Sequence, residues 1–212
     1  MRIEVNHASK TIKKVLVLED VCLKFESGKV YGIEGPNGSG KTMLMRAILG
    51  LIRLDSGSVL VDGERIGRDL DFAPDAGALI ESASFLPGKT GRDNLLYLTR
   101  IKKIAGEDEV DAALAEVGLL DAGKKKFRQY SLGMRQRLGI AAAIVEKPRL
   151  VVLDEPTNAL DESGIEMVQR VVSEQKARGA LVVVSCHSAE LLGSMADVRI
   201  RMAEGRVIGA EG

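Results

Sequence analysis

Gly35-Pro36-Asn37-Gly38-Ser39-Gly40-Lys41-Thr42 has the pattern GxxxxGK[ST]. The segment lies between an apolar, strand-like run at residues 30–33 and a helix-like run at residues 43–49. In that context the glycines let backbone N–H groups line a concave anion site, and the helix dipole points its positive end at the same place. Lys41 would then contact the β- and γ-phosphates, and the Thr42 hydroxyl would ligate Mg²⁺. The segment therefore predicts a nucleotide-phosphate site.

The composition predicts one compact domain without a nucleic-acid partner. The chain has 212 residues, of which 45% are hydrophobic and 28% are charged, and this is enough for a substantial core. Thirty basic residues balance thirty acidic ones, and Lys124-Lys125-Lys126 is the only cationic run. Nucleic-acid-binding proteins instead carry a basic patch or stripe.

Cysteine usage and hydropathy predict a soluble, cytoplasmic protein. Cys22 and Cys186 both lie in apolar runs, which predicts buried free thiols in a reducing compartment. Residues 1–5 do not resemble a signal peptide. The longest apolar runs, at residues 138–145 and 180–186, are too short to cross a bilayer.

Hydrophobic periodicity predicts an α/β fold. Residues 2–6 and 21–26 alternate with the two-residue period of half-buried strands. The middle of the chain, to about residue 146, has a helical pattern. Strand-like and helix-like runs then alternate, at residues 150–153, 163–177, 181–185, 189–195 and 198–202. The run at 150–153 is apolar on both faces, which is typical of a central parallel strand covered by helices.

This central strand ends in two carboxylates, Asp154 and Glu155. A strand end beside a phosphate loop is where Mg²⁺ and an attacking water need acidic partners. Asp154 would hold the metal, and Glu155 would polarise the water. Adjacent carboxylates at a strand end are common without a catalytic role, so this prediction depends on the phosphate loop.

These motifs, in this order, resemble those of the nucleotide-binding subunits of ABC transporters over nearly the whole chain. The phosphate loop is similar to the Walker A motif of the family, and Leu150 to Glu155 is similar to its Walker B strand with the catalytic glutamate. His187 lies where the family has a switch histidine. Residues 158–161 resemble its D-loop, and residues 130–134 resemble a variant of its LSGGQ signature.

The resemblance implies a P-loop ATPase of the ABC type, in which a mixed-sheet core (residues 1–81 and 147–212) carries an inserted helical signature subdomain (residues 82–146). It also implies a second nucleotide-binding subunit, identical or not, with two ATP molecules bound between the two. Lys41, Glu155 and His187 would be catalytic. Ser131, Gly133, Met134 and Asp161 would contact the ATP bound by the opposite subunit, although Ser131 could also be a plain helix N-cap.

The chain departs from the family pattern at three places. Glu81 stands where the family has its Q-loop glutamine; it would ligate Mg²⁺, or else it faces solvent. Ile12 stands where an aromatic side chain stacks on adenine, which predicts weak discrimination between ATP and GTP. Leu132 and Met134 replace a glycine and the glutamine of the signature.

The variant signature and the segment after Glu81 most resemble the single-domain ATPases of bacterial bacitracin-like and lantibiotic-like export systems. The resemblance therefore implies a motor at the inner face of the cell membrane, exporting a peptide, a lipid or a drug-like compound through a separate integral membrane subunit. Residues 82–98, with Phe85, Leu86 and Pro87, would contact that subunit or form the core of the insertion. Two alternatives stay open: a soluble mechanical clamp, and a regulatory module that binds nucleotide without hydrolysing it.

Overall fold

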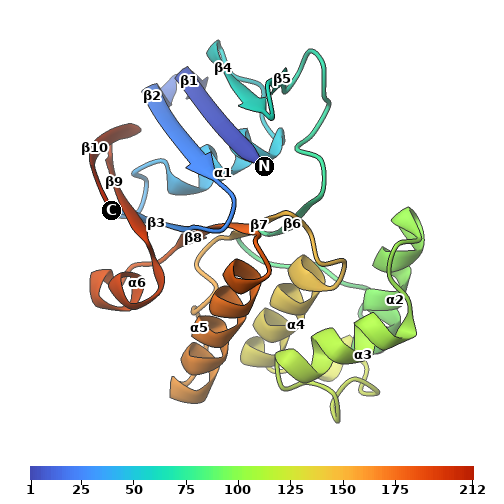
Figure 1. The fold of residues 1–212 in the computed structure, drawn as a ribbon. Coiled ribbons are helices and arrows are strands. Elements are labelled where there is room, and N and C mark those ends of the chain that lie inside the picture. Colours follow the sequence, from blue (N-terminus) through green and yellow to red (C-terminus); the bar gives the residue numbers. More distant parts are fainter.

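The computed structural model covers residues 1–212 and contains two sheets with one helix between them (Figure 1). The enclosed helix is α1 (Lys41–Leu49). The smaller sheet is antiparallel, and its strand order is β2 (Val15–Glu26), β1 (Arg2–Ile12), β4 (Ser56–Val61) and β5 (Glu64–Arg65). The larger sheet has the order β10 (Arg206–Glu211), β9 (Val198–Ala203), β3 (Val30–Glu34), β8 (Leu181–Ser185), β7 (Leu150–Leu153) and β6 (Ala76–Leu79). All its neighbouring strands are parallel except β10, so the sheet is mixed.

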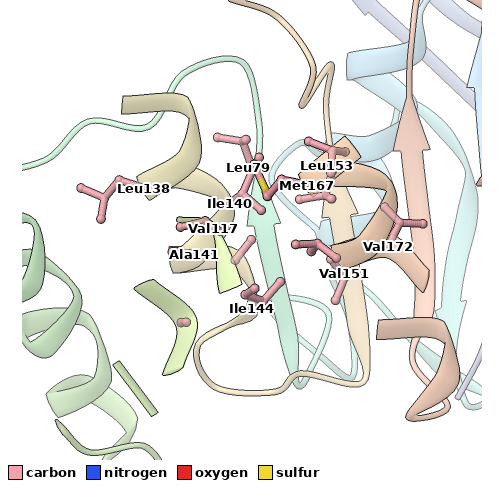
Figure 2. Close-up of a cluster of buried hydrophobic side chains, with 14 of the residues drawn as sticks. Leu79, Val117, Leu138, Ile140, Ala141, Ile144, Val151, Leu153, Met167 and Val172 are labelled. Carbon is pink, nitrogen blue, oxygen red and sulfur yellow. The ribbon is translucent and has the colours of Figure 1, made fainter. Parts of the chain in front are cut away.

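Strand β7 shows why the core has two halves. Its four residues are all fully buried, and successive side chains point to opposite faces. Leu150 and Val152 pack into the cluster that surrounds α1, between the sheets. Val151 and Leu153 pack into a second cluster with helices α4 (Leu132–Ile144) and α5 (Glu162–Ala177) (Figure 2). The apolar run predicted to be a central strand is therefore covered on both faces.

The predicted helical insertion holds α2 (Gly91–Lys102), α3 (Glu107–Glu116), a short 3₁₀ helix (Phe127–Gln129) and α4. Helix α6 (Ala189–Met195) follows β8. Helix α4 lies directly against β6, and a Cβ atom on Gly77 would be 1.8 Å from the Ala143 carbonyl oxygen. This close approach anchors the insertion to the sheet, while α2 and α3 lie farther out (Figure 1).

Three details differ from the predictions. The first two strands are longer than expected, and β10 was not predicted because its sequence has little apolar periodicity; it is an edge strand that pairs with β9. The prediction that Cys22 is buried is wrong, whereas Cys186 is buried as expected. Strand alternation explains the error, because Val21 and Phe25 face the core and Cys22 points the opposite way. None of the helices combines the length and the apolar character that a bilayer crossing requires.

Candidate active site

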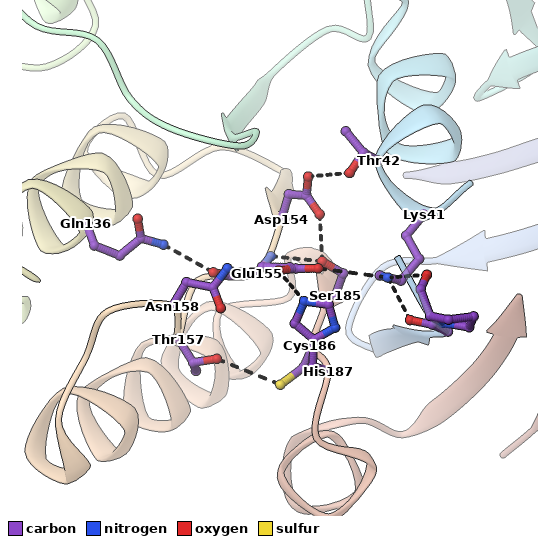
Figure 3. Close-up of polar contacts among 12 residues, drawn as sticks. Lys41, Thr42, Gln136, Asp154, Glu155, Thr157, Asn158, Ser185, Cys186 and His187 are labelled. Atoms are coloured by element: carbon purple, nitrogen blue, oxygen red, sulfur yellow. Dashed lines mark hydrogen bonds and ion pairs between the residues drawn. The ribbon is translucent and has the colours of Figure 1, made fainter. Parts of the chain in front are cut away.

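The phosphate loop joins β3 to α1, and its backbone depends on glycine. Gly40 has φ 101° and is the N-cap of α1, and a Cβ atom there would lie 2.7 Å from the Val17 carbonyl oxygen. Gly38 has φ 79° and open space where a side chain would be, so a ligand can approach this backbone closely. Lys41 is buried, and its Nζ donates to the carbonyl oxygens of Gly35 (2.7 Å) and Pro36 (3.2 Å). The loop therefore holds the lysine amino group above its own backbone (Figure 3).

Asp154 lies at the end of β7 and is bound by hydroxyl groups from two other elements. The Thr42 Oγ1 donates to Asp154 Oδ2 at 2.7 Å, and the Ser185 Oγ donates to Oδ1 at 2.7 Å. The predicted metal-binding pair, Thr42 and Asp154, is thus in direct contact. Ser185 was missed in the sequence. The available signal was its position at the end of the neighbouring parallel strand, where Leu153 pairs with Val184.

Glu155 lies at the centre of the site. Its N–H donates to Ser185 Oγ (2.8 Å), and its backbone has φ 49°, in the left-handed region. One carboxylate oxygen contacts the His187 Nε2 at 2.7 Å and accepts from the Asn158 Nδ2 at 2.8 Å. The other lies 3.8 Å from the Lys41 Nζ. The structure therefore brings together the three residues predicted to be catalytic (Figure 3).

The donor set fits a nucleotide with a hard divalent cation. Mg²⁺ prefers oxygen ligands, and the Thr42 hydroxyl and the Asp154 carboxylate supply two adjacent ones. The phosphate loop supplies backbone N–H groups and the Lys41 charge. The Ser39 hydroxyl is buried beneath this loop without a hydrogen-bond partner. The Oε2 of Glu34, directly before the loop, is likewise buried without a partner.

Of the two predictions for Glu81, the structure matches the solvent-facing one. Its carboxylate accepts from Arg46 at 2.8 Å, and its side chain is 61% exposed. Arg46 lies one helical turn after Thr42, so Glu81 is on the Thr42 side of α1. To ligate a metal ion, Glu81 would first have to release Arg46.

The signature segment begins α4. Ser131 is the helix N-cap, and its hydroxyl accepts from the Met134 N–H at 3.2 Å. Gln136 donates to the Glu155 carbonyl oxygen at 3.2 Å, so the first turns of α4 contact the loop after β7. A Cβ atom on Gly133 would lie 3.1 Å from the Ala159 carbonyl oxygen. The signature is therefore packed against the loop that follows Glu155.

Two further predicted contact residues lie at the ends of secondary-structure elements. Asp161 is the N-cap of α5, and the Ser163 hydroxyl and the Gly164 N–H lower the pKa of its carboxyl group. Ile12 ends β1 and is half-buried. The structure assigns Asp161 a capping role and leaves its role toward nucleotide as a prediction.

Comparisons with known proteins identify the family. A family model described as ABC transporter matches residues 18–158, which include the phosphate loop, Asp154 and Glu155. The chain belongs to the ABC transporter family. It is an ABC ATPase; Ser185 and His187 lie beyond the matched region. Family membership and the fold confirm the predicted α/β P-loop architecture.

Individual relatives cover almost the whole chain. It is 42% identical over 205 residues to an uncharacterized ABC transporter ATP-binding protein, YybJ, of Bacillus subtilis, covering 97% of this chain and 94% of the relative. It is 33% identical over 207 residues to the lantibiotic transport ATP-binding protein SrtF of Streptococcus pyogenes, covering 97% and 89%. The predicted resemblance to ATPases of lantibiotic-like systems is confirmed.

A solved structure shows what a related cassette does. It is the dimeric post-hydrolysis state of an ATP-binding cassette bound to ADP and Pi, with a TM-score of 0.87 and 25% identity. The alignment covers 99% of this chain and 97% of that one.

Proposed function

We propose that this ABC ATPase is the motor subunit of an exporter: it dimerises around two ATP molecules and drives a separate integral membrane protein from the inner face of the membrane. The position of Glu155 carries the proposal. Its carboxylate contacts His187 and faces Lys41 above the phosphate loop, where a γ-phosphate would end. Such a carboxylate can take a proton from a water that attacks this phosphate.

In this mechanism each residue has a separate role. The phosphate loop binds the β- and γ-phosphates, and Lys41 exchanges its carbonyl partners for phosphate oxygens. Glu155 accepts the proton of the attacking water. His187 releases Glu155 and contacts the γ-phosphate, so the pair present without nucleotide would open when ATP binds.

Thr42 and Asp154 would hold Mg²⁺, which offsets the negative charge that the phosphates develop. Ser185 keeps Asp154 in place through its 2.7 Å hydrogen bond. Glu81 would contribute a further oxygen after releasing Arg46. Asp154 is almost fully buried, so its orientation is set before the metal binds.

The second subunit would complete the site with its signature segment. Ser131 and Leu132 are exposed, and Leu132 is 69% exposed at the first position of α4. The N-terminal amides of this helix form an anion site. In a head-to-tail dimer, Ser131, Gly133, Met134 and Asp161 would cover the γ-phosphate held by the partner.

Helix α2 supplies the surface proposed for the membrane subunit. Leu86 just before it, and Leu98 and Ile101 on it, are 53%, 39% and 77% exposed. Phe85 is instead half-buried, with its ring 5.2 Å from that of Phe127, so it belongs to the core of the insertion. Within the predicted contact segment, Leu86 and the outer face of α2 are therefore exposed for binding the membrane subunit. Phe85 is packed inside the insertion.

The cargo class is proposed from a relative. SrtF is named a lantibiotic transport protein. A peptide, a lipid or a drug-like compound would be the cargo, and the membrane subunit would select it.

Affinity purification from gently solubilised membranes of the source cell tests the proposal. We expect a polytopic membrane protein to be recovered with the tagged chain. The variant Ile101→Glu should no longer recover the membrane protein, because a charge among the exposed apolar side chains of α2 would oppose binding. Ile208→Glu is the matched control, since Ile208 is 64% exposed on β10. Recovery of soluble partners alone would favour the soluble clamp.

A further inference from the structure

We propose that His7, Asp20 and Cys22 form a Zn²⁺ site on the β1–β2 hairpin. A ring nitrogen, a carboxylate oxygen and the sulfur of these residues all lie within 4.8 Å of one another. All three side chains are exposed, so an ion can reach them. None of them belongs to the active site, and nothing in the hydrolysis mechanism uses them.

An irregularity in the strand pairing gathers these residues. Val5 pairs with Leu23 and Ala8 with Val21, so β1 has one extra residue between Val5 and Ala8, and His7 in this interval has φ 49°. Such a bulge redirects a side chain and is a recurrent feature near functional sites. Asp20 precedes Cys22 by two residues on β2 and has φ 50°, where the pairing shifts register a second time, between Ala8 and Lys10.

Hydrogen bonds hold the three groups in place. The His7 N–H donates to the Cys22 Sγ at 3.2 Å, and the His7 Nδ1 lies 2.7 Å from the Asp20 Oδ1. The Asp20 N–H donates to the Ser9 Oγ at 3.0 Å. Hydrogen bonds of this kind orient metal ligands.

The ligand chemistry selects zinc over the harder cations. Thiolate and imidazole suit Zn²⁺, whereas Mg²⁺ and Ca²⁺ prefer oxygen ligands. With the thiol deprotonated, Cys22 and Asp20 together balance the charge of the ion. Three protein ligands leave the fourth tetrahedral position to water.

The required movement is small. Tetrahedral Zn²⁺ bonds of about 2.0–2.3 Å place ligand atoms roughly 3.3–3.6 Å apart. His7 and Asp20 would separate by less than about 1 Å as the ion replaces their hydrogen bond, and the sulfur would move inward. Exposed side chains can rotate to allow this.

Co²⁺ titration of the metal-free, nucleotide-free full chain tests the site, because a cobalt–thiolate bond gives a near-ultraviolet charge-transfer band. We expect one equivalent of Co²⁺ to produce this band, and Zn²⁺ to abolish it. Cys22→Ser should remove the band, and His7→Ala should weaken binding by about tenfold or more. Circular dichroism would show that both variants remain folded.

Cys186→Ala is the matched control, because Cys186 is the other thiol and lies beside the active site. This variant should keep the band. Loss of the band in Cys186→Ala but not in Cys22→Ser would place the metal at the active site and overturn the proposal. Absence of any charge-transfer band in the unmodified chain would overturn it as well.

Discussion

The adjacent carboxylates of Asp154 and Glu155 differ in what they contact. Both oxygens of Asp154 accept hydrogen bonds from neutral hydroxyl groups, those of Thr42 and Ser185. The oxygens of Glu155 instead face the ammonium of Lys41 and the imidazole of His187. Asp154 is buried at 3% exposure, whereas the Glu155 side chain is 21% exposed. This difference supports assigning the metal to Asp154 and the proton transfer to Glu155.

Glu155→Gln is expected to reduce hydrolysis by about 10²–10⁴-fold, because the amide cannot accept the proton of the attacking water. ATP binding should be retained, since Lys41 and Thr42 are unchanged. Phosphate release and equilibrium binding of labelled ATP would measure the two effects separately. Glu162→Gln, at an exposed position of the first turn of α5, is the control. Unchanged turnover in Glu155→Gln would remove this residue from the role of base.

The position of Ile12 bears on the selectivity of the protein between ATP and GTP. Without an aromatic ring, about 0.5–1.5 kcal/mol of stacking is missing, and no polar group of Ile12 distinguishes adenine from guanine. ATP and GTP should therefore be hydrolysed with similar efficiency. Values of kcat/KM for the two nucleotides measure this. A preference for ATP of about 100-fold or more, equivalent to ~2.7 kcal/mol, would show that another group reads the base.

At the scale of elements, α3 and α5 meet through a half-buried carboxyl group. Burial and the nearby charge of Glu174 raise the pKa of Glu116 on α3 to about 7. The Gln175 Nε2 donates to the Glu116 carboxyl group at 3.4 Å, and Arg170 donates to its main-chain oxygen at 3.2 Å. This contact joins the predicted helical insertion to the ATPase core.

Glu116 should make stability depend on pH. Its pKa is raised in the folded state, so the folded protein retains a proton that the unfolded chain releases. The free energy of unfolding should therefore fall by about 1–3 kcal/mol as the pH rises from about 4.5 to about 7, and remain lower above that. Glu116→Gln should remove this part of the pH dependence in urea unfolding. Glu166→Gln, at an exposed position of α5, should leave the pH dependence of the unfolding free energy unchanged. If both variants gave the same pH dependence, Glu116 would not be the group responsible.

At the scale of the whole molecule, the proposed dimer would take one half of each of two different sites from one chain. The phosphate loop, Asp154 and Glu155 form one half, at the carboxyl ends of the interior strands β3 and β7. The signature segment forms the other, and in this chain the Ser131 hydroxyl caps its own helix, α4. In the proposed dimer, a second copy or a related subunit would join the two halves.

Ser131→Arg should therefore prevent ATP-dependent dimerisation. In the Glu155→Gln background, where ATP persists, sedimentation with Mg²⁺ and ATP should show a dimer that is lost on Ser131→Arg. Losing the N-cap costs only about 0.5–2 kcal/mol, so the variant should remain folded and still bind nucleotide. Leu120→Arg is the control, because Leu120 is exposed in the segment that follows α3. A dimer that survives Ser131→Arg would exclude the signature segment from the interface.

The sequence alone was sufficient for the phosphate loop, the buried strand β7 and the carboxylates after it. These features are local: glycines permit the loop conformation, and a strand that is apolar on both faces has to be covered on both. Their chemistry could therefore be predicted without knowing which strands are neighbours.

The tertiary structure decided the contacts between distant segments. Ser185 contacts Asp154 because β7 and β8 pair in one parallel register, and Glu81 contacts Arg46 because β6 ends beside α1. The approach of His7 to Cys22 likewise depends on a one-residue bulge, and a single-residue shift changes which face a side chain occupies. Such contacts depend on register and packing across the whole chain, which local residue patterns do not contain.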